Sequence, residues 1–333
     1  MSASSPQASQ LDLQLQSGKL PILRVEASED AVGWAAEYRV ALRSVVAEHG
    51  SILVRGLGLR DAAQVGAVFQ RLGIGLMIEK EAFASRKLYA DGIYSSSTWP
   101  SNQPMCMHHE LSYVLEVPGL MLFACITAPT EGGATAVADA PTVLEALPAD
   151  LVARFEREGW MLTRSYNEDI GMSYAEAFGT DDRRAIESYC RANKIELEWQ
   201  PNGGLRTRQR RRAIVRHPGT NQRCWFNQVA FLNQWTLEPE VREFLVEMYG
   251  VDGLPFNTCF GNGDPIGEDI VQAVNEVYAR HTTREPWQAG DLMLVDNVRT
   301  AHSREAYKGQ REVLVAMTDA LRLDECSSTQ PSR

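Results

Sequence analysis

This chain of 333 residues lacks the features that mark several large classes of protein. No apolar run approaches the roughly 20 residues that a helix needs to cross a bilayer, so we expect no membrane partner. The net charge of −10 disfavours nucleic acid as a partner and favours solubility. The chain also has no Gly-x-Gly-x-x-Gly after a predicted strand and no phosphate-binding loop, which removes the usual support for a nucleotide site.

Cysteine is scarce and scattered. The six cysteines form no Cys-x-x-Cys pair, which argues against a disulfide framework or a thiolate zinc site and suits reduced thiols in the cytoplasm. Residues 1–19 are rich in Ser and Gln without an apolar core, so we expect a disordered tail and no signal peptide. Residues 324–333 are expected to form a second loose tail. Residues 20–323 then predict a single domain, since β-rich enzymes of this length often fold as one.

Short apolar segments dominate the chain, without regular alternation of strands and helices. Helical spacing occurs at 30–50, 61–72, 141–159, 181–194, 239–249 and 267–281. Strand-like runs occur at 20–25, 51–57, 118–128, 134–138, 196–199, 290–297 and 312–318, and at 214–226 on both sides of a Pro218-Gly219 turn. The run at 118–128 is continuously apolar, which predicts a strand buried on both faces. Many short strands with a few helices favour a mainly β fold with helical insertions, an antiparallel sandwich or jelly roll, over a Rossmann sheet.

Histidine is also rare, and two of the six histidines are adjacent in Met-Cys-Met-His108-His109-Glu110. Side chains two apart on a strand point to the same side, so His108 and Glu110 can face one ion while His109 faces away. His302, which follows the apolar strand predicted at 290–297 with the break Asp296-Asn297 between, is the candidate third ligand. Two imidazoles and a carboxylate on one face of an octahedron leave three open positions, which suits iron(II). Zinc accepts the same ligands, so ligand type alone leaves the metal open.

Five segments, in this order and spacing, resemble a known family of enzymes. They are His108–Tyr113, Gly132–Thr135, Trp225–Gln228, Asp296–His302 and Tyr307–Arg311. The sequence is identified by them as a member of the TauD/TfdA (taurine dioxygenase-like) family of iron(II)/2-oxoglutarate oxygenases. It is closer to the branch that resembles clavaminate synthase and the syringomycin-pathway hydroxylase, in which the first motif is His-x-Glu.

The resemblance covers roughly residues 20–320 and implies a double-stranded β-helix (jelly roll, cupin-like). It implies that His108, Glu110 and His302 hold iron(II), and that Thr135 and Arg311 bind 2-oxoglutarate. A guanidinium can meet the distal carboxylate of that co-substrate with two parallel hydrogen bonds. Arg304 is a rival to Arg311 for this role.

The reaction implied is hydroxylation of an unactivated C–H bond by dioxygen, with release of succinate and CO2. The implied substrate is an amino acid or a derivative of one, free or bound to a carrier protein, in a natural-product pathway. Desaturation, epoxidation and cyclisation use the same ligands and remain open. Halogenases lack the carboxylate that Glu110 supplies, so halogenation is excluded. Alternatives from other classes are a zinc hydrolase, which lacks an evident general base, and a non-catalytic jelly-roll binding protein.

Substrate contacts are predicted at five further residues, namely Thr98, Tyr113, Asn227, Gln228 and Arg304. Five clustered arginines also stand out in this acidic chain, at Arg206, Arg208, Arg210, Arg211 and Arg212. We expect the cluster to be a solvated loop. Its alternative role is a lid that captures a carboxylate, or a dock for an acidic carrier protein. The expected partner is a small molecule, and a homo-oligomer is also considered.

Overall fold

The computed structural model describes residues 11, 13–16, 18–26, 30–167 and 169–322. Most of the predicted tails, 1–19 and 324–333, lies outside these residues. Within the first tail, β1 (Leu13–Gln14) pairs antiparallel with β2 (Ile22–Arg24), so this part of the predicted tail is ordered. No helix of the described chain combines the length and the apolar character needed to span a membrane.

An eight-stranded sheet forms the largest layer of the molecule, in the order β1-β2-β3-β16-β7-β19-β5-β4. Its remaining strands are β3 (Ser51–Arg55), β16 (Leu292–Asp296), β7 (Glu116–Thr127), β19 (Glu312–Arg322), β5 (Ile93–Ser95) and β4 (Leu88–Ala90). The pairs are antiparallel except for β2 and β3, which are parallel because α1 (Ala31–His49) connects them. The predicted opening of strand, helix and strand is therefore confirmed.

The central strand β7 is buried on both faces, as its continuous apolar run predicted. On one face it packs under α1 and α2 (Ala62–Leu72), through Leu120, Leu122 and Ala124. On the other face it packs toward a three-stranded sheet of β6 (Met105–His108), β17 (Thr300–Arg304) and β9 (Thr135–Asp139), through Met121, Phe123 and Cys125. These two sheets enclose the core, and the predicted jelly roll, a double-stranded β-helix with helical insertions, is confirmed.

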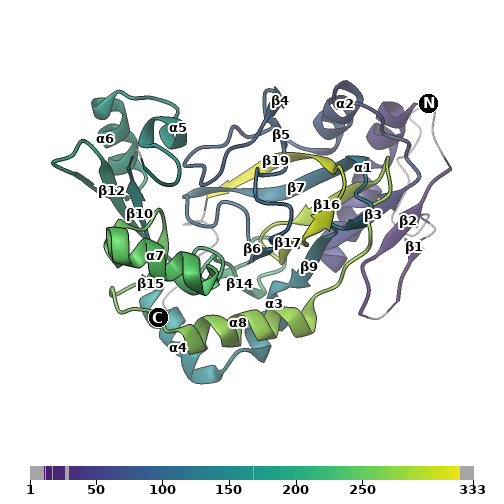
Figure 1. Ribbon diagram of the computed structural model, residues 1–333. Helices are drawn as coiled ribbons and strands as arrows, with labels where there is room; N and C mark the ends of the chain where they lie inside the picture. The colour runs from purple at the N-terminus through teal and green to yellow at the C-terminus, as the bar shows by residue number, and fades with distance from the viewer. Residues whose placement is uncertain (1–10, 12, 17, 27–29, 168, 323–333) are drawn as a thin grey trace, which may run out of the picture.

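A second structural unit is inserted between β9 and β16. Its four-stranded sheet is β11 (Glu196–Trp199), β12 (Leu205–Arg211), β10 (Trp160–Tyr166) and β15 (Asn257–Phe260). Its helices are α3 (Ala140–Ala146), α4 (Ala149–Glu158), α5 (Tyr174–Phe178), α6 (Arg183–Ala192), α7 (Pro239–Tyr249) and α8 (Glu268–His281). Two short strand pairs complete the described chain, β13 (Ile214–Arg216) on β14 (Arg223–Trp225) and β8 (Glu131–Gly132) on β18 (Tyr307–Lys308). Figure 1 shows β10, β12, α5 and α6 on the left, far from α1 and β1 on the right.

The expectation of a solvated loop at the arginine cluster is wrong. Arg206–Arg211 lie in β12, which is paired on both sides by β10 and β11. Alternate residues of β12 face inward, so Arg211 is buried and only 6% exposed. Its guanidinium donates to the carbonyl oxygens of Tyr113 at 2.6 Å and Asn193 at 3.0 Å. This segment forms a strand because it pairs with β10 and β11, and local sequence patterns do not reveal such pairing.

The helix predicted over 141–159 is also corrected, because the structure has two helices there. α3 ends at Ala146, and α4 begins after Pro148. The residue before a proline is driven away from helical dihedral angles, and Leu147 accordingly has φ −73° and ψ 151°. The apolar spacing continued across this break and concealed it.

Candidate active site

The two predicted histidine ligands come from neighbouring antiparallel strands. His302 in β17 is directly paired with His108 in β6, which brings their ring centroids to 4.4 Å. One ligand atom from each of His108, Glu110 and His302 lies within 4.8 Å of the others. Glu110 Oε2 is 3.5 Å from His302 Nε2 and 3.9 Å from His108 Nε2. The three side chains are at most 6% exposed, so the cluster is a buried site.

Glu110 reaches this cluster from a turn, which corrects the expectation that it shares a strand with His108. β6 ends at His108, and Leu111 adopts a left-handed φ of 53°. His109 does face away, as predicted, and its Nδ1 donates to the carbonyl of Asn297 at 2.6 Å. The side chain of Asn297 in turn binds the backbone of Glu110. The position of the Glu110 carboxylate therefore depends on a contact with a residue far away in the sequence, and not on the alternation of side chains along a strand.

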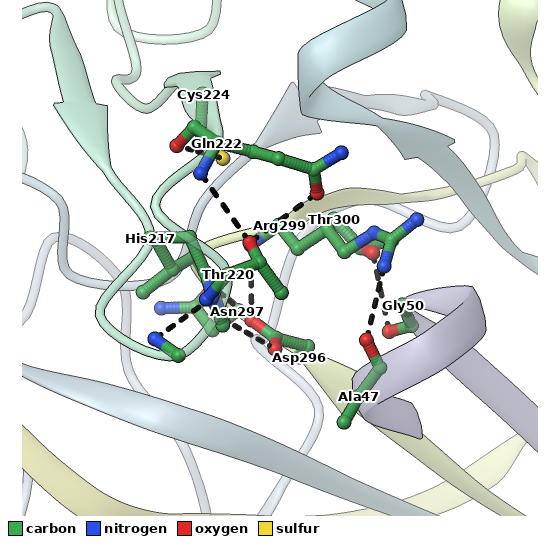
Figure 2. A network of polar contacts seen from close by, with 12 residues as sticks. Ala47, Gly50, His217, Thr220, Gln222, Cys224, Asp296, Asn297, Arg299 and Thr300 are labelled. Carbon is green, nitrogen blue, oxygen red and sulfur yellow. Dashed lines mark hydrogen bonds and ion pairs between the residues drawn. The ribbon is translucent and has the colours of Figure 1, made fainter. Parts of the chain in front are cut away.

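The turn between β16 and β17 is fixed by a polar network around Asp296 (Figure 2). His217 Nδ1 accepts hydrogen bonds from the amides of Gly219 and Thr220, so its Nε2–H donates to Asp296 Oδ2 at 2.8 Å. The other carboxylate oxygen of Asp296, Oδ1, accepts hydrogen bonds from the backbone amides of Val298 and Arg299. The start of β17 is thus held in place, and His302 is held with it.

The protonation of the cluster suits a cation. His108 donates its Nδ1–H to the carbonyl of Cys106 at 2.8 Å, which leaves Nε2 with a free lone pair. Burial, and then the neighbouring His302, lower the pKa of His108 to about 3, so its ring is neutral near pH 7. Burial opposes ionisation of Glu110, but Arg86 and His302 outweigh it and hold the pKa of Glu110 below its usual range.

The donor set therefore fits a divalent metal. Two imidazoles and one carboxylate converge on one side of a cavity, and side chains of the other strands line the rest of it. Such a ligand set leaves open positions for small molecules. The cavity walls include Ser96, Ser97, Met105, Phe123, Thr135, Ser303, Arg311, Val313 and Val315.

Arg311 is partly buried and carries its charge into this cavity without a carboxylate partner. Its guanidinium donates to the carbonyl of Gly133 at 2.9 Å and to Ser96 Oγ at 3.1 Å, and Nη2 lies 3.5 Å from Thr135 Oγ1. No carboxylate of the described residues forms an ion pair with it. Burial, and then the charge of Arg304, lower the pKa of Arg311 to about 10. An anion bound in the cavity relieves this cost of burial.

Arg304 also borders the cavity, but its guanidinium is already used. It donates to the backbone carbonyls of Trp99, Pro100 and Gln103 at 2.7–3.0 Å. This favours Arg311 over its rival as the group that meets a ligand carboxylate.

The structure does not place the other four predicted substrate residues in the cavity. Thr98 is exposed, whereas Tyr113, Asn227 and Gln228 are at most 2% exposed. Each of these side chains donates a hydrogen bond to a backbone carbonyl oxygen. The acceptors are Ser85 for Thr98, Glu81 for Tyr113, Ala213 for Asn227 and His109 for Gln228. Their contacts hold loops and strands together around the site.

Arg86 and Trp287 are site residues that the sequence did not reveal. Arg86 Nη2 donates to Glu110 Oε1 at 2.9 Å, and Trp287 Nε1 donates to Thr135 Oγ1 at 3.3 Å. Arg86 lies within the polar segment 83–104, and the position of this segment just before the metal motif favours a loop that faces the site. Nothing in the sequence distinguishes it from the other arginines.

A His-Glu-His cluster and a partly buried arginine, which line one cavity of a double-stranded β-helix, are the arrangement of a metal-dependent oxygenase. Comparisons with known proteins agree. Residues 27–318 match the family model described as "Taurine catabolism dioxygenase TauD, TfdA family". The chain belongs to this TauD/TfdA family, as its sequence motifs indicated, and it is an iron(II)/2-oxoglutarate-dependent oxygenase.

Individual relatives support the same assignment. The chain is 32% identical to the dapdiamide synthesis protein DdaC of Enterobacter agglomerans over 275 residues, which cover 83% of this chain and 84% of that one. It is 26% identical to a clavaminate synthase-like protein of Arabidopsis thaliana, over 83% of each chain. The solved structure of PvcB, an Fe, alpha-ketoglutarate dependent oxygenase from an isonitrile synthetic pathway, shares the fold with a TM-score of 0.54 and 17% identity, covering 96% of each chain.

Proposed function

We propose that this oxygenase hydroxylates an unactivated C–H bond of an amino acid or an amino-acid derivative, free or carrier-bound, in a natural-product pathway. In this proposal His108, Glu110 and His302 hold iron(II), while Thr135 and Arg311 bind 2-oxoglutarate. The observation that carries it is the convergence of three buried ligands and one unneutralised guanidinium on a single cavity. The name of the relative DdaC, a dapdiamide synthesis protein, supports a substrate from a biosynthetic pathway.

Bound iron supplies oxygen activation that is coupled to decarboxylation of 2-oxoglutarate to succinate and CO2. The protein contributes position and exclusion of water. His108 and His302 present Nε2 from paired strands, whose register fixes their separation. Arg311 and the Thr135 hydroxyl orient the distal carboxylate of 2-oxoglutarate at the far wall. Phe123, Val313 and Val315 add apolar side chains to the cavity wall, and a less polar surrounding strengthens the polar contacts inside it.

The proposal is tested by anaerobic titration of the apo-protein, first with iron(II) and then with 2-oxoglutarate. Chelation of the keto acid at iron gives a visible metal-to-ligand charge-transfer band, and we expect it in the wild type and not in His302→Ala. If iron binds without this band, the proposed 2-oxoglutarate site is wrong. If zinc supports turnover of a hydrolysable substrate and iron does not, the zinc-hydrolase alternative replaces it.

The reaction outcome is then read from product masses after screening amino acids and carrier-bound amino acids. Hydroxylation adds one oxygen atom to the substrate, whereas desaturation or ring closure removes two hydrogen atoms. A gain of oxygen at a saturated carbon supports the proposed hydroxylation. A product that lacks added oxygen moves desaturation or cyclisation ahead of it, and addition of oxygen across a double bond identifies epoxidation.

A further inference from the structure

The two oxygens of the Glu110 carboxylate have different partners. Oε2 faces the two histidine nitrogens, at 3.5 and 3.9 Å. Oε1 points the other way and accepts a hydrogen bond from Arg86 Nη2 at 2.9 Å. The side chains of Glu110 and Arg86 are only 2% and 5% exposed, so water does not compete for this contact.

Arg86 is itself held by a second carboxylate. Its Nε lies 3.2 Å from Glu79 Oε2, and the Glu79 side chain is 7% exposed. The three side chains form a buried row in which Arg86 lies between two carboxyl groups. Its guanidinium is therefore shared between Glu79 and Glu110.

The segment that carries Arg86 is fastened to the inserted unit. Arg164 donates to the carbonyls of Glu81 at 2.7 Å and Ala82 at 2.8 Å, and the Tyr113 hydroxyl donates to the same Glu81 carbonyl. Glu81 also adopts a left-handed φ of 56°, a conformation that non-glycine residues rarely keep without such support. Arg86 thus approaches Glu110 from a fixed backbone.

We propose that Arg86 is a positioning residue that keeps Glu110 a one-oxygen ligand of the metal; this inference rests on the proposed function. An octahedral ion bound by two histidines and one carboxylate oxygen keeps three positions, two for the chelating keto acid and one for dioxygen. If both oxygens of Glu110 bound the ion, only two positions would remain. A charge-assisted hydrogen bond to Oε1 opposes that second contact and fixes the rotamer of the carboxylate.

The test compares binding constants under anaerobic conditions and needs no turnover. Iron(II) affinity of the apo-protein and 2-oxoglutarate affinity of the iron-loaded protein are measured by calorimetry for wild type and Arg86→Met. We expect iron to bind as tightly as in wild type or more tightly, since a cation near the site is removed. We expect 2-oxoglutarate to bind about 10-fold or more weakly, in the range that loss of an outer-shell partner causes.

Three further variants distinguish the effect of the Arg86–Glu110 contact from a general loss of packing. Arg55→Met removes another buried arginine, 3.3 Å from Asp291, and controls for stability without touching the cavity. Glu79→Gln removes the second carboxyl group of the row and leaves the Arg86–Glu110 contact, so 2-oxoglutarate affinity should stay near that of wild type. Arg86→Gln repeats the measurement with a polar side chain that cannot reach both carboxylates, if the methionine variant does not fold.

The inference is overturned if Arg86→Met leaves 2-oxoglutarate affinity unchanged, if it weakens iron and 2-oxoglutarate binding together, or if Glu79→Gln has the same effect as Arg86→Met. The proposed function fails separately. In that case wild type itself gives no 2-oxoglutarate complex with iron.

Discussion

Asn297 holds the backbone of Glu110 from both sides. Its Oδ1 accepts the Glu110 amide at 2.7 Å, and its Nδ2 donates to the Glu110 carbonyl at 3.0 Å and to the Pro118 carbonyl at 2.9 Å. Asn297 is fully buried and precedes β17, the strand of His302. One side-chain amide therefore joins the backbone of Glu110, which lies 187 residues away in the chain, to the turn that leads into the strand of His302.

Replacement of Asn297 by alanine should weaken both the fold and the metal site. It leaves buried backbone groups of Glu110 and Pro118 without partners, at a cost of about 1–3 kcal/mol in the free energy of unfolding. We expect iron(II) affinity to fall by roughly 10-fold, as for other outer-shell partners of metal ligands. Urea unfolding and calorimetry check the two effects. Asn262→Ala, which changes an exposed turn, is the control, and equal iron affinity in both variants would contradict the prediction.

Loss of a proposed ligand should affect the metal more than the fold. His302→Ala is expected to weaken iron(II) binding by more than the roughly 10–100-fold that outer-shell changes cause, and to abolish turnover. Its circular dichroism spectrum should remain that of wild type, because the core beneath β17 is apolar. His49→Ala, at the end of α1 and outside the cavity, should retain iron and activity. A His302→Ala protein that kept full activity would show that the ligand assignment is wrong.

Substitution of Arg311 should weaken 2-oxoglutarate binding more than substitution of Arg304. Arg311→Met leaves the co-substrate carboxylate without its cation, and we expect a cost of about 2–5 kcal/mol in binding, which is at least about 30-fold in Kd. Arg304→Met instead leaves three backbone carbonyls without donors and should mainly lower the free energy of unfolding. Calorimetry on the iron-loaded variants measures both. The reverse pattern would transfer the role to Arg304.

Members of the arginine strand should differ according to burial. Arg211→Met removes a donor to the Asn193 carbonyl and one of two donors to the Tyr113 carbonyl, and should lower the free energy of unfolding by about 2–3 kcal/mol. Arg208→Met, on the partly exposed side of β12, should cost less than about 0.5 kcal/mol. Urea denaturation of the two variants provides the comparison. Equal and small effects would mean that Arg211 is not a structural residue.

Local sequence patterns were sufficient for the elements whose burial is uniform along the chain. The continuous apolar run of β7 predicted a strand covered on both faces, and the structure packs helices on one face and the second sheet on the other. Asp30 caps α1 by accepting the amide of Gly33, and Gly50 ends it with φ 80°, a conformation that glycine adopts without strain. The order and spacing of the histidine, glycine and arginine motifs also sufficed to indicate the family.

Only the tertiary structure decided how the site is assembled. Glu110 leaves the strand of His108 and is directed to the proposed metal site by Asn297, and Arg86 reaches its second oxygen from a separate segment. The arginines at 206–211 became a strand because β10 and β11 flank them, and Asn227 and Gln228 turned to the backbone instead of the cavity. The sequence by itself determined which chemical groups are available and in what order. Their roles depend on partners tens to hundreds of residues away, whose hydrogen bonds exist only once the chain is folded.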